Sequence, residues 1–126
     1  MSIYNIEETE KTPAIIFDLN KGELIVSGNS IPEDPIQFYS ILNEYIDKYI
    51  QAPKPSTNVT FRMNYINTSS SRHILDILKK LESISKNDST ITVSWIYEHD
   101  DQDMEDAGND YQSIVDLTFN LVPIKV

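Results

Sequence analysis

The chain has no cysteine and only three glycines among its 126 residues. Without cysteine it can form no disulfide, no thiolate metal site and no thiol nucleophile. Gly22, Gly28 and Gly108 lie far apart, so none of them builds a phosphate-cradling loop. A Gly-x-Ser-x-Gly motif is also missing, and only two histidines are available as imidazole bases. The usual signatures of nucleotide binding and of nucleophilic hydrolysis are therefore absent.

Long apolar runs and basic residues are scarce as well. No stretch approaches the roughly 20 apolar residues that span a bilayer, and the N-terminus lacks the positive flank and apolar core of a signal peptide. Ten Lys and Arg face twenty Asp and Glu, which gives a net charge of −10. Such a charge disfavours nucleic acid and anionic membranes as partners. We expect a cytoplasmic protein.

The apolar pattern predicts one α/β domain over residues 1–126, with residues 1–12 as a loosely held lead-in. A helix should begin at Pro35 behind an Asp34 cap and bury one side, which carries Phe38, Ile41, Leu42, Tyr45, Ile46 and Tyr49. A third helix, near Tyr111, should be broken or kinked at Gly108. The other expected elements are a helix over 74–84 and strands over 14–18, 23–28, 59–65, 90–98 and 117–122.

The later strands each have a polar side, so helices should cover only one face of the sheet. The predicted fold is therefore a two-layer α/β sandwich with a mixed five-stranded sheet.

The most informative stretch joins the 59–65 strand to the next helix. There, four consecutive hydroxyl residues, 68–71, lie between Asn67 and Arg72. A helix N-terminus favours a hydroxyl cap and, equally, a phosphate. One hydroxyl can cap the helix while another stays available to a kinase, and a phosphate would add about −1.5 to −2 charges beside Arg72 and His73. We predict a phosphorylation switch at Thr68. The alternative sites are Ser69, Ser70 and Ser71, and helix capping is the competing interpretation for each.

Acidic residues gather further on, seven of them within residues 98–110. The spacing does not meet the calcium-loop template, which requires glycine at the sixth place and glutamate at the twelfth. No Lys or Arg occurs between Lys86 and Lys125, so this half of the chain should attract a basic protein surface. The rival interpretation is a small acid-base or metal-dependent enzyme that uses Glu98, Asp100, Asp101 and Asp103.

Several segments together resemble the SiaC-type bacterial regulatory phosphoproteins over nearly the whole chain. The Asn-Thr-Ser-Ser segment and the later acidic Asp-Met segment are specific in combination. The matching stretches are 16–18 with Gly22, 27–34, 65–70, Trp95, 97–104 and Gly108.

This resemblance implies a non-enzymatic domain similar to the STAS-type anti-sigma-factor antagonists, without cofactor or metal. In the family, a Ser/Thr protein kinase modifies the threonine that matches Thr68, and a metal-dependent protein phosphatase of the PP2C type reverses the modification. The unmodified form binds and activates a diguanylate cyclase in cyclic-di-GMP and biofilm signalling. The alternative is an antagonist that sequesters an anti-sigma kinase. The expected partner contacts are Asn67, Ser69, Ser70, Arg72, Ser30, Glu33, Glu98, Asp100, Asp101 and Asp103.

Overall fold

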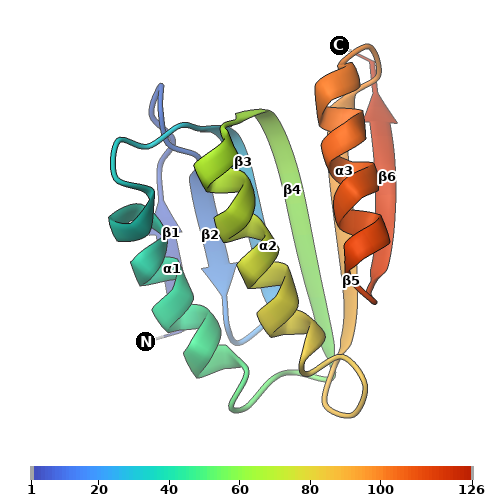
Figure 1. Cartoon of the computed structure of the whole chain (residues 1–126). Helices are drawn as coiled ribbons and strands as arrows, with labels where there is room; N and C mark the ends of the chain where they lie inside the picture. The colour runs from blue at the N-terminus through green and yellow to red at the C-terminus, as the bar shows by residue number, and fades with distance from the viewer. Residues whose placement is uncertain (1, 126) are drawn as a thin grey trace.

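Within residues 2–125, which the computed structural model describes, six strands form one sheet and three helices pack against it (Figure 1). The order of the strands across the sheet is the order along the chain, β1-β2-β3-β4-β5-β6. The elements are β1 (Ile3–Ile6), β2 (Ala14–Asp18), β3 (Glu23–Ser30), α1 (Pro35–Tyr49), β4 (Ser56–Ile66), α2 (Thr68–Glu82), β5 (Thr90–Glu98), α3 (Gln102–Ile114) and β6 (Thr118–Ile124).

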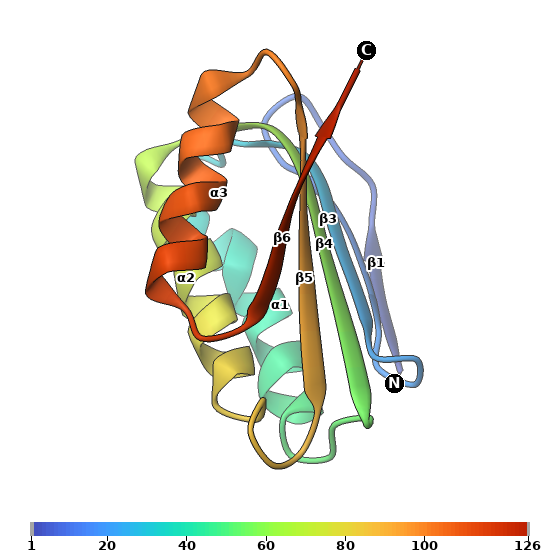
Figure 2. The same ribbon diagram turned by 90° about the vertical axis from the view of Figure 1, so that its right-hand side faces the viewer.

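All three helices lie on the same face of the sheet, as the sequence predicts (Figure 2). Strands β1, β2 and β3 are antiparallel neighbours, whereas β3, β4, β5 and β6 run parallel to one another. Each parallel connection contains one helix. Because these connections share one hand and the sheet grows in one direction, every helix falls on the same side. The sheet is therefore mixed, with two layers.

The predictions of a loose lead-in and of five strands are wrong, because residues 3–6 form the additional strand β1. This strand pairs antiparallel with β2 at the edge of the sheet. Tyr4 points to the helix side and stacks on Tyr45 of α1, with 4.9 Å between the ring centroids. The run is only four residues long and lies among polar residues, so its strand character depends on pairing with β2.

The prediction of a break at Gly108 is also wrong, because α3 is continuous from Gln102 to Ile114. The glycine serves close packing instead: a Cβ atom at this position would lie 2.5 Å from Cδ1 of the buried Trp95. The Trp95 indole nitrogen donates a hydrogen bond to the carbonyl of Met104 at 2.8 Å. Helix α3 is thus held directly against the aromatic core of the sheet.

Helix α1 begins as predicted, with Pro35 in its first turn and the Asp34 side chain accepting a hydrogen bond from the Gln37 amide at 3.1 Å. Its buried side differs from the prediction in one respect. Ile41 is 45 % exposed, whereas Tyr39, which the apolar pattern left out, is fully buried. The helix therefore presents an apolar residue on its outer surface.

In the part of the chain that the structure describes, no helix combines the length and the apolar character needed to cross a membrane.

Candidate functional site

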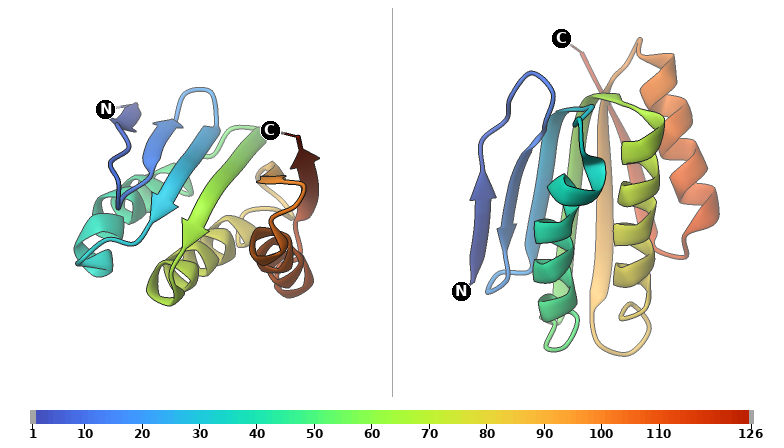
Figure 3. Two further views of the ribbon diagram at one scale, coloured as in Figure 1. Left: turned by 90° about the horizontal axis from the view of Figure 1, so that it is seen from above. Right: turned by 60° about the vertical axis from the view of Figure 1, so that its left-hand side comes forward.

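The three helices all begin at one end of the sheet, where the parallel strands finish (Figure 3). We call this end the carboxyl edge. Asp34, Asn67 and Asp101 are the caps of α1, α2 and α3, and each precedes the first residue of its helix. The carboxyl edge therefore gathers three helix N-termini and their partial positive charges. The predicted hydroxyl segment and the predicted acidic segment both lie on it.

Asn67 caps α2, so none of the four hydroxyl residues is needed for that role. Its side-chain oxygen accepts a hydrogen bond from the Ser70 amide at 2.9 Å. The backbone amide of Asn67 donates a hydrogen bond to the carbonyl of Ser30 at 3.1 Å, which fixes the end of β4 against β3. Thr68 is the first residue of α2, and both Thr68 and Ser69 are exposed. Thr68 is accordingly exposed, and its hydroxyl is not needed to cap the helix.

Ser30 and Ser70, predicted as partner contacts and, for Ser70, as an alternative phosphorylation site, are both fully buried. The Ser30 hydroxyl donates to the Ser70 hydroxyl at 2.7 Å. Since Ser30 has a single hydrogen to give, the Tyr39 hydroxyl, 2.6 Å away, must donate to Ser30. Burial raises the pKa of Tyr39, partly offset by these hydrogen bonds, so the phenol stays protonated. This chain of hydroxyls joins β3, α1 and α2 in the interior, away from the surface that a partner or a kinase would meet.

Ser71 is half-buried and connects α2 to α3. The Tyr111 hydroxyl donates to the Ser71 carbonyl at 2.9 Å, so the Ser71 hydroxyl donates to Tyr111 at 3.1 Å. Burial raises the pKa of Tyr111 to about 12, which keeps this donor protonated in the physiological range. Of the four hydroxyl residues, only Thr68 and Ser69 therefore combine exposure with freedom from this packing.

Arg72 is the exposed cation beside the hydroxyl segment. It follows Thr68 by four residues, which places the two on one face of α2. Within residues 2–125 Arg72 takes part in no ion pair. His73, the other predicted positive neighbour, is half-buried and stacks on the Tyr39 ring with a centroid distance of 5.0 Å. Arg72 is thus an exposed cation on the same face of α2 as Thr68.

The acidic segment builds the start of α3. Glu98 ends β5, and Asp100 lies in the exposed turn that follows. The Asp101 side chain caps α3 by accepting a hydrogen bond from the Met104 amide at 3.1 Å. Asp103 lies in the first turn, where the helix dipole favours an acid. Among the described residues, no three Asp, Glu or His side chains are grouped so that they could hold a metal ion.

A hollow of about 270 Å³ brings the two predicted segments together between the end of β4, α2 and α3. Ser71 contributes from the hydroxyl segment and Asp103 from the acidic one. Tyr65, at the end of the strand predicted over 59–65, is 54 % exposed because it lies where β4 ends, beside the starts of the helices. Sequence reasoning missed Tyr65 and Met104 as lining residues. The full lining is Tyr65, Ile66, Ser71, Asp103, Met104, Ala107 and Tyr111.

Glu33 precedes the cap of α1 on the same edge. Its side chain is 87 % exposed and lies 3.4 Å from the ammonium of Lys11. An exposed pair of this kind contributes little to stability. Glu33 is therefore an exposed acid of this edge, and it lies beside α1, outside the hollow at Tyr65.

Comparison with known proteins agrees with this architecture. The family described as SiaC family regulatory phosphoprotein matches residues 6–124. An uncharacterized protein of Pseudomonas aeruginosa (strain UCBPP-PA14) is 24 % identical over 119 residues, which cover 94 % of each chain.

Solved structures of SiaC from Pseudomonas aeruginosa have the same fold. The crystal structure of diguanylate cyclase SiaD in complex with its activator SiaC matches with a TM-score of 0.90 and 22 % identity, over 96 % of this chain and 99 % of the other. Apo-SiaC matches with a TM-score of 0.86 and 23 % identity, over 97 % and 99 % of the two chains. Because the family match spans almost all of the sequence, this chain belongs to the SiaC family of regulatory phosphoproteins.

Proposed function

We propose that this chain is a cytoplasmic, non-enzymatic adaptor whose unphosphorylated form binds and activates a diguanylate cyclase, and that a phosphate on Thr68 ends the binding. Family membership and the shared fold with an activator of a diguanylate cyclase support the proposal. The observation that carries it is the exposure of Thr68 at the first position of α2, while Asn67 caps the helix. The threonine can therefore be modified without loss of the cap.

A phosphate at this position would change the charge of the carboxyl edge in two ways. It would add about −1.5 to −2 charges to a chain that already carries −10. It would also lie one helical turn before Arg72, and an acid placed before a base at this spacing forms a favourable pair. The helix dipole favours the same arrangement. The phosphate would thus pair with Arg72, and it would repel carboxylates of a partner that docks at the start of α2.

The switch needs two further partners, a Ser/Thr protein kinase and a protein phosphatase of the metal-dependent PP2C type. Ser69 is the second candidate acceptor because it is also exposed. We propose that the cyclase contacts Ser69, Arg72 and the exposed acids of the same edge. A phosphorylatable hydroxyl at a helix start is also expected of STAS-type anti-sigma-factor antagonists, and we propose that the switch logic is shared.

The first test is phosphorylation by the purified cognate kinase with ATP, followed by mass analysis of the peptides. The expected product carries one phosphate on Thr68, and Thr68→Ala abolishes it while Ser69→Ala does not. A product without phosphate on any of residues 68–71 would refute the switch.

The second test measures cyclic-di-GMP production by the cognate cyclase. Thr68→Ala should activate the cyclase as the parent does, even after incubation with the kinase, whereas Thr68→Asp should activate it weakly. Equal activation by both variants would exclude this mechanism. Binding to an anti-sigma kinase, with no effect on the cyclase, would favour the antagonist alternative.

A further inference from the structure

We propose that two copies of this chain pair through the outer edge of β1, with helix α1 of one copy packed beside α1 of the other. The proposal concerns a surface on the opposite side of the molecule from α3, and it does not depend on the proposed function. It follows from the two sheet edges, from the exposed apolar residues and from two unpaired charges.

The two edges of the sheet are protected to different degrees. Edge strand β6 contains Pro123, and the Gln112 side chain donates a hydrogen bond to the Phe119 carbonyl at 2.7 Å. Both features hinder the addition of another strand. Strand β1 has the sequence Ile-Tyr-Asn-Ile, with no proline and no charge, and within the described chain it pairs only with β2. An edge without such protection is the one prepared to pair.

Exposed apolar side chains occur on both layers of this half of the molecule: Ile3, Ile16 and Ile25 lie on the helix-free face of the sheet, and Ile36 and Ile41 lie on α1. Eight large apolar residues are exposed in the part of the chain that the structure describes, and five of them belong to the first three strands or to α1.

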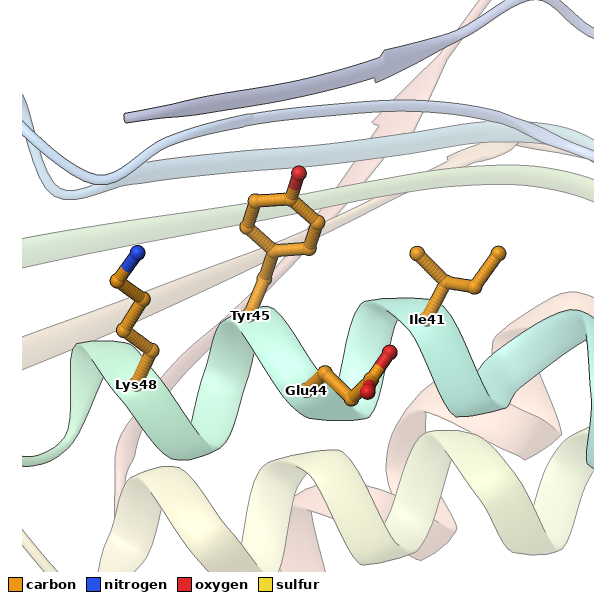
Figure 4. A pocket seen from close by; sticks show the side chains of 4 residues that line it. All are labelled: Ile41, Glu44, Tyr45 and Lys48. Carbon is orange, nitrogen blue, oxygen red and sulfur yellow. The ribbon is translucent and has the colours of Figure 1, made fainter. Parts of the chain in front are cut away.

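A hollow of about 300 Å³ lies along α1 and is lined by Ile41, Glu44, Tyr45 and Lys48. Figure 4 shows Ile41, Tyr45 and Lys48 projecting to the same side of the helix. An apolar hollow beside an unprotected strand is a surface that a second copy can cover.

The charges beside this hollow can pair with the same charges of a second copy. Glu44 and Lys48 carry opposite charges one turn apart, and neither forms an ion pair within residues 2–125. Asp47, by contrast, points toward α2 and lies 2.7 Å from Lys80. A two-fold axis places each surface residue of one copy against the same surface of the other. Glu44 can then pair with Lys48 of the second copy, and the reverse pair forms at the same time.

The stacking of Tyr4 on Tyr45 fixes the level of this axis. The stacked rings place the middle of β1 beside the turn of α1 that contains Glu44 and Lys48. An axis perpendicular to the sheet that passes just outside β1, level with its middle, makes the two β1 strands antiparallel neighbours and keeps all helices on one face. The two α1 helices then run antiparallel with these charges near the axis. The carboxyl edges face opposite ends, so Thr68 stays uncovered in both copies.

The charge pairing can be tested with matched reversals in sedimentation velocity experiments across a range of concentrations. Glu44→Lys alone and Lys48→Glu alone each place like charges at the axis and should raise the dimer dissociation constant about tenfold. The double variant restores opposite charges and should return it to near the parent value. Ile41→Asp should abolish the dimer, whereas Ile114→Asp, at a similarly exposed site on α3, should not. Circular dichroism confirms that each variant is folded.

The strand pairing can be tested by disulfide trapping, because the chain has no cysteine of its own. Single cysteines placed in turn at residues 3, 4, 5 and 6 should yield a covalent dimer on oxidation at the position nearest the axis. Asn120→Cys on β6 should not. A chain that sediments as a monomer at every concentration would overturn the proposal. So would a dimer that ignores the charge reversals and Ile41→Asp.

Discussion

Replacing Gly108 by alanine tests how closely α3 is packed on the sheet. The added Cβ would lie 2.5, 2.9 and 3.1 Å from the Cδ1, Nε1 and Cγ atoms of Trp95. Carbon atoms in contact normally lie about 3.5–4.0 Å apart, so the ring or the helix must move by about 1 Å. Trp95 is 1 % exposed, and Phe61 and Tyr111 pack against it with centroid distances of 5.5 and 5.3 Å. The ring has no room to yield, and the helix must therefore shift.

The net cost can be worked out from opposing contributions. Alanine gains about 1 kcal/mol over glycine inside a helix. Overpacking a core costs about 1–3 kcal/mol, and loss of the hydrogen bond from Trp95 to Met104 costs about 1 kcal/mol more. We expect Gly108→Ala to lower the free energy of unfolding by about 1–3 kcal/mol, the balance of these effects.

The assay is denaturant unfolding followed by the fluorescence of Trp95, the chain's one tryptophan. Asn109→Ala is the matched control, because this neighbouring residue is exposed and alanine there should be neutral or slightly stabilising. A Gly108→Ala variant as stable as the parent would refute the packing argument. It would also weaken the case that α3 holds Asp103 and Met104 at a fixed place on the carboxyl edge.

Two further predictions concern stability. Asn67→Ala should lower the free energy of unfolding by about 1 kcal/mol, because it removes the cap of α2, whereas Thr68→Ala should change it by less than about 0.5 kcal/mol. The same denaturant assay checks both, and a larger loss for Thr68→Ala would contradict the assignment of the cap. At high pH, ionisation of Tyr111 should destabilise the fold. Its pKa is raised from the ordinary value of 10.0 to about 12 in the folded chain. The stabilisation that the protonated phenol provides is therefore complete below pH 10.0 and is lost as the pH rises from 10.0 to about 12. The loss should reach about 2–3 kcal/mol in unfolding measured across this range, and a Tyr111→Phe variant with the same alkaline decline as the parent would show that another group is responsible.

The sequence predicts the elements whose signals are local. Alternation is clear in 90–98, Asn20 and Gly22 mark the turn between the apolar runs 14–18 and 23–28, and an Asp-Pro pair marks the start of α1, so these elements agree with the structure. The family resemblance is likewise confirmed over nearly the whole chain. The order of layers follows from the polar sides of the strands. These features are encoded within a few residues of one another.

What the sequence hides depends on distant neighbours. Asn67 and the four hydroxyls after it are all acceptable caps locally, and only the geometry at the end of β4 selects Asn67. Ser70 is buried by Ser30, 40 positions earlier in the chain, and no local pattern reports that contact. In the sequence, Gly108 inside a helix pattern indicates a kink. In the structure, its missing side chain instead lets α3 pack closely against Trp95. Strand β1 is too short to be recognised without β2 beside it.

The measurement that bears most directly on the switch is the affinity of this chain for its cognate diguanylate cyclase before and after phosphorylation by the kinase, determined by calorimetry on the same preparation. A phosphate on Thr68 should raise the dissociation constant by at least about tenfold, equivalent to about 1.4 kcal/mol. Phosphatase treatment should restore the original value. Equal affinities for the unmodified chain and the chain phosphorylated at Thr68 would contradict the switch.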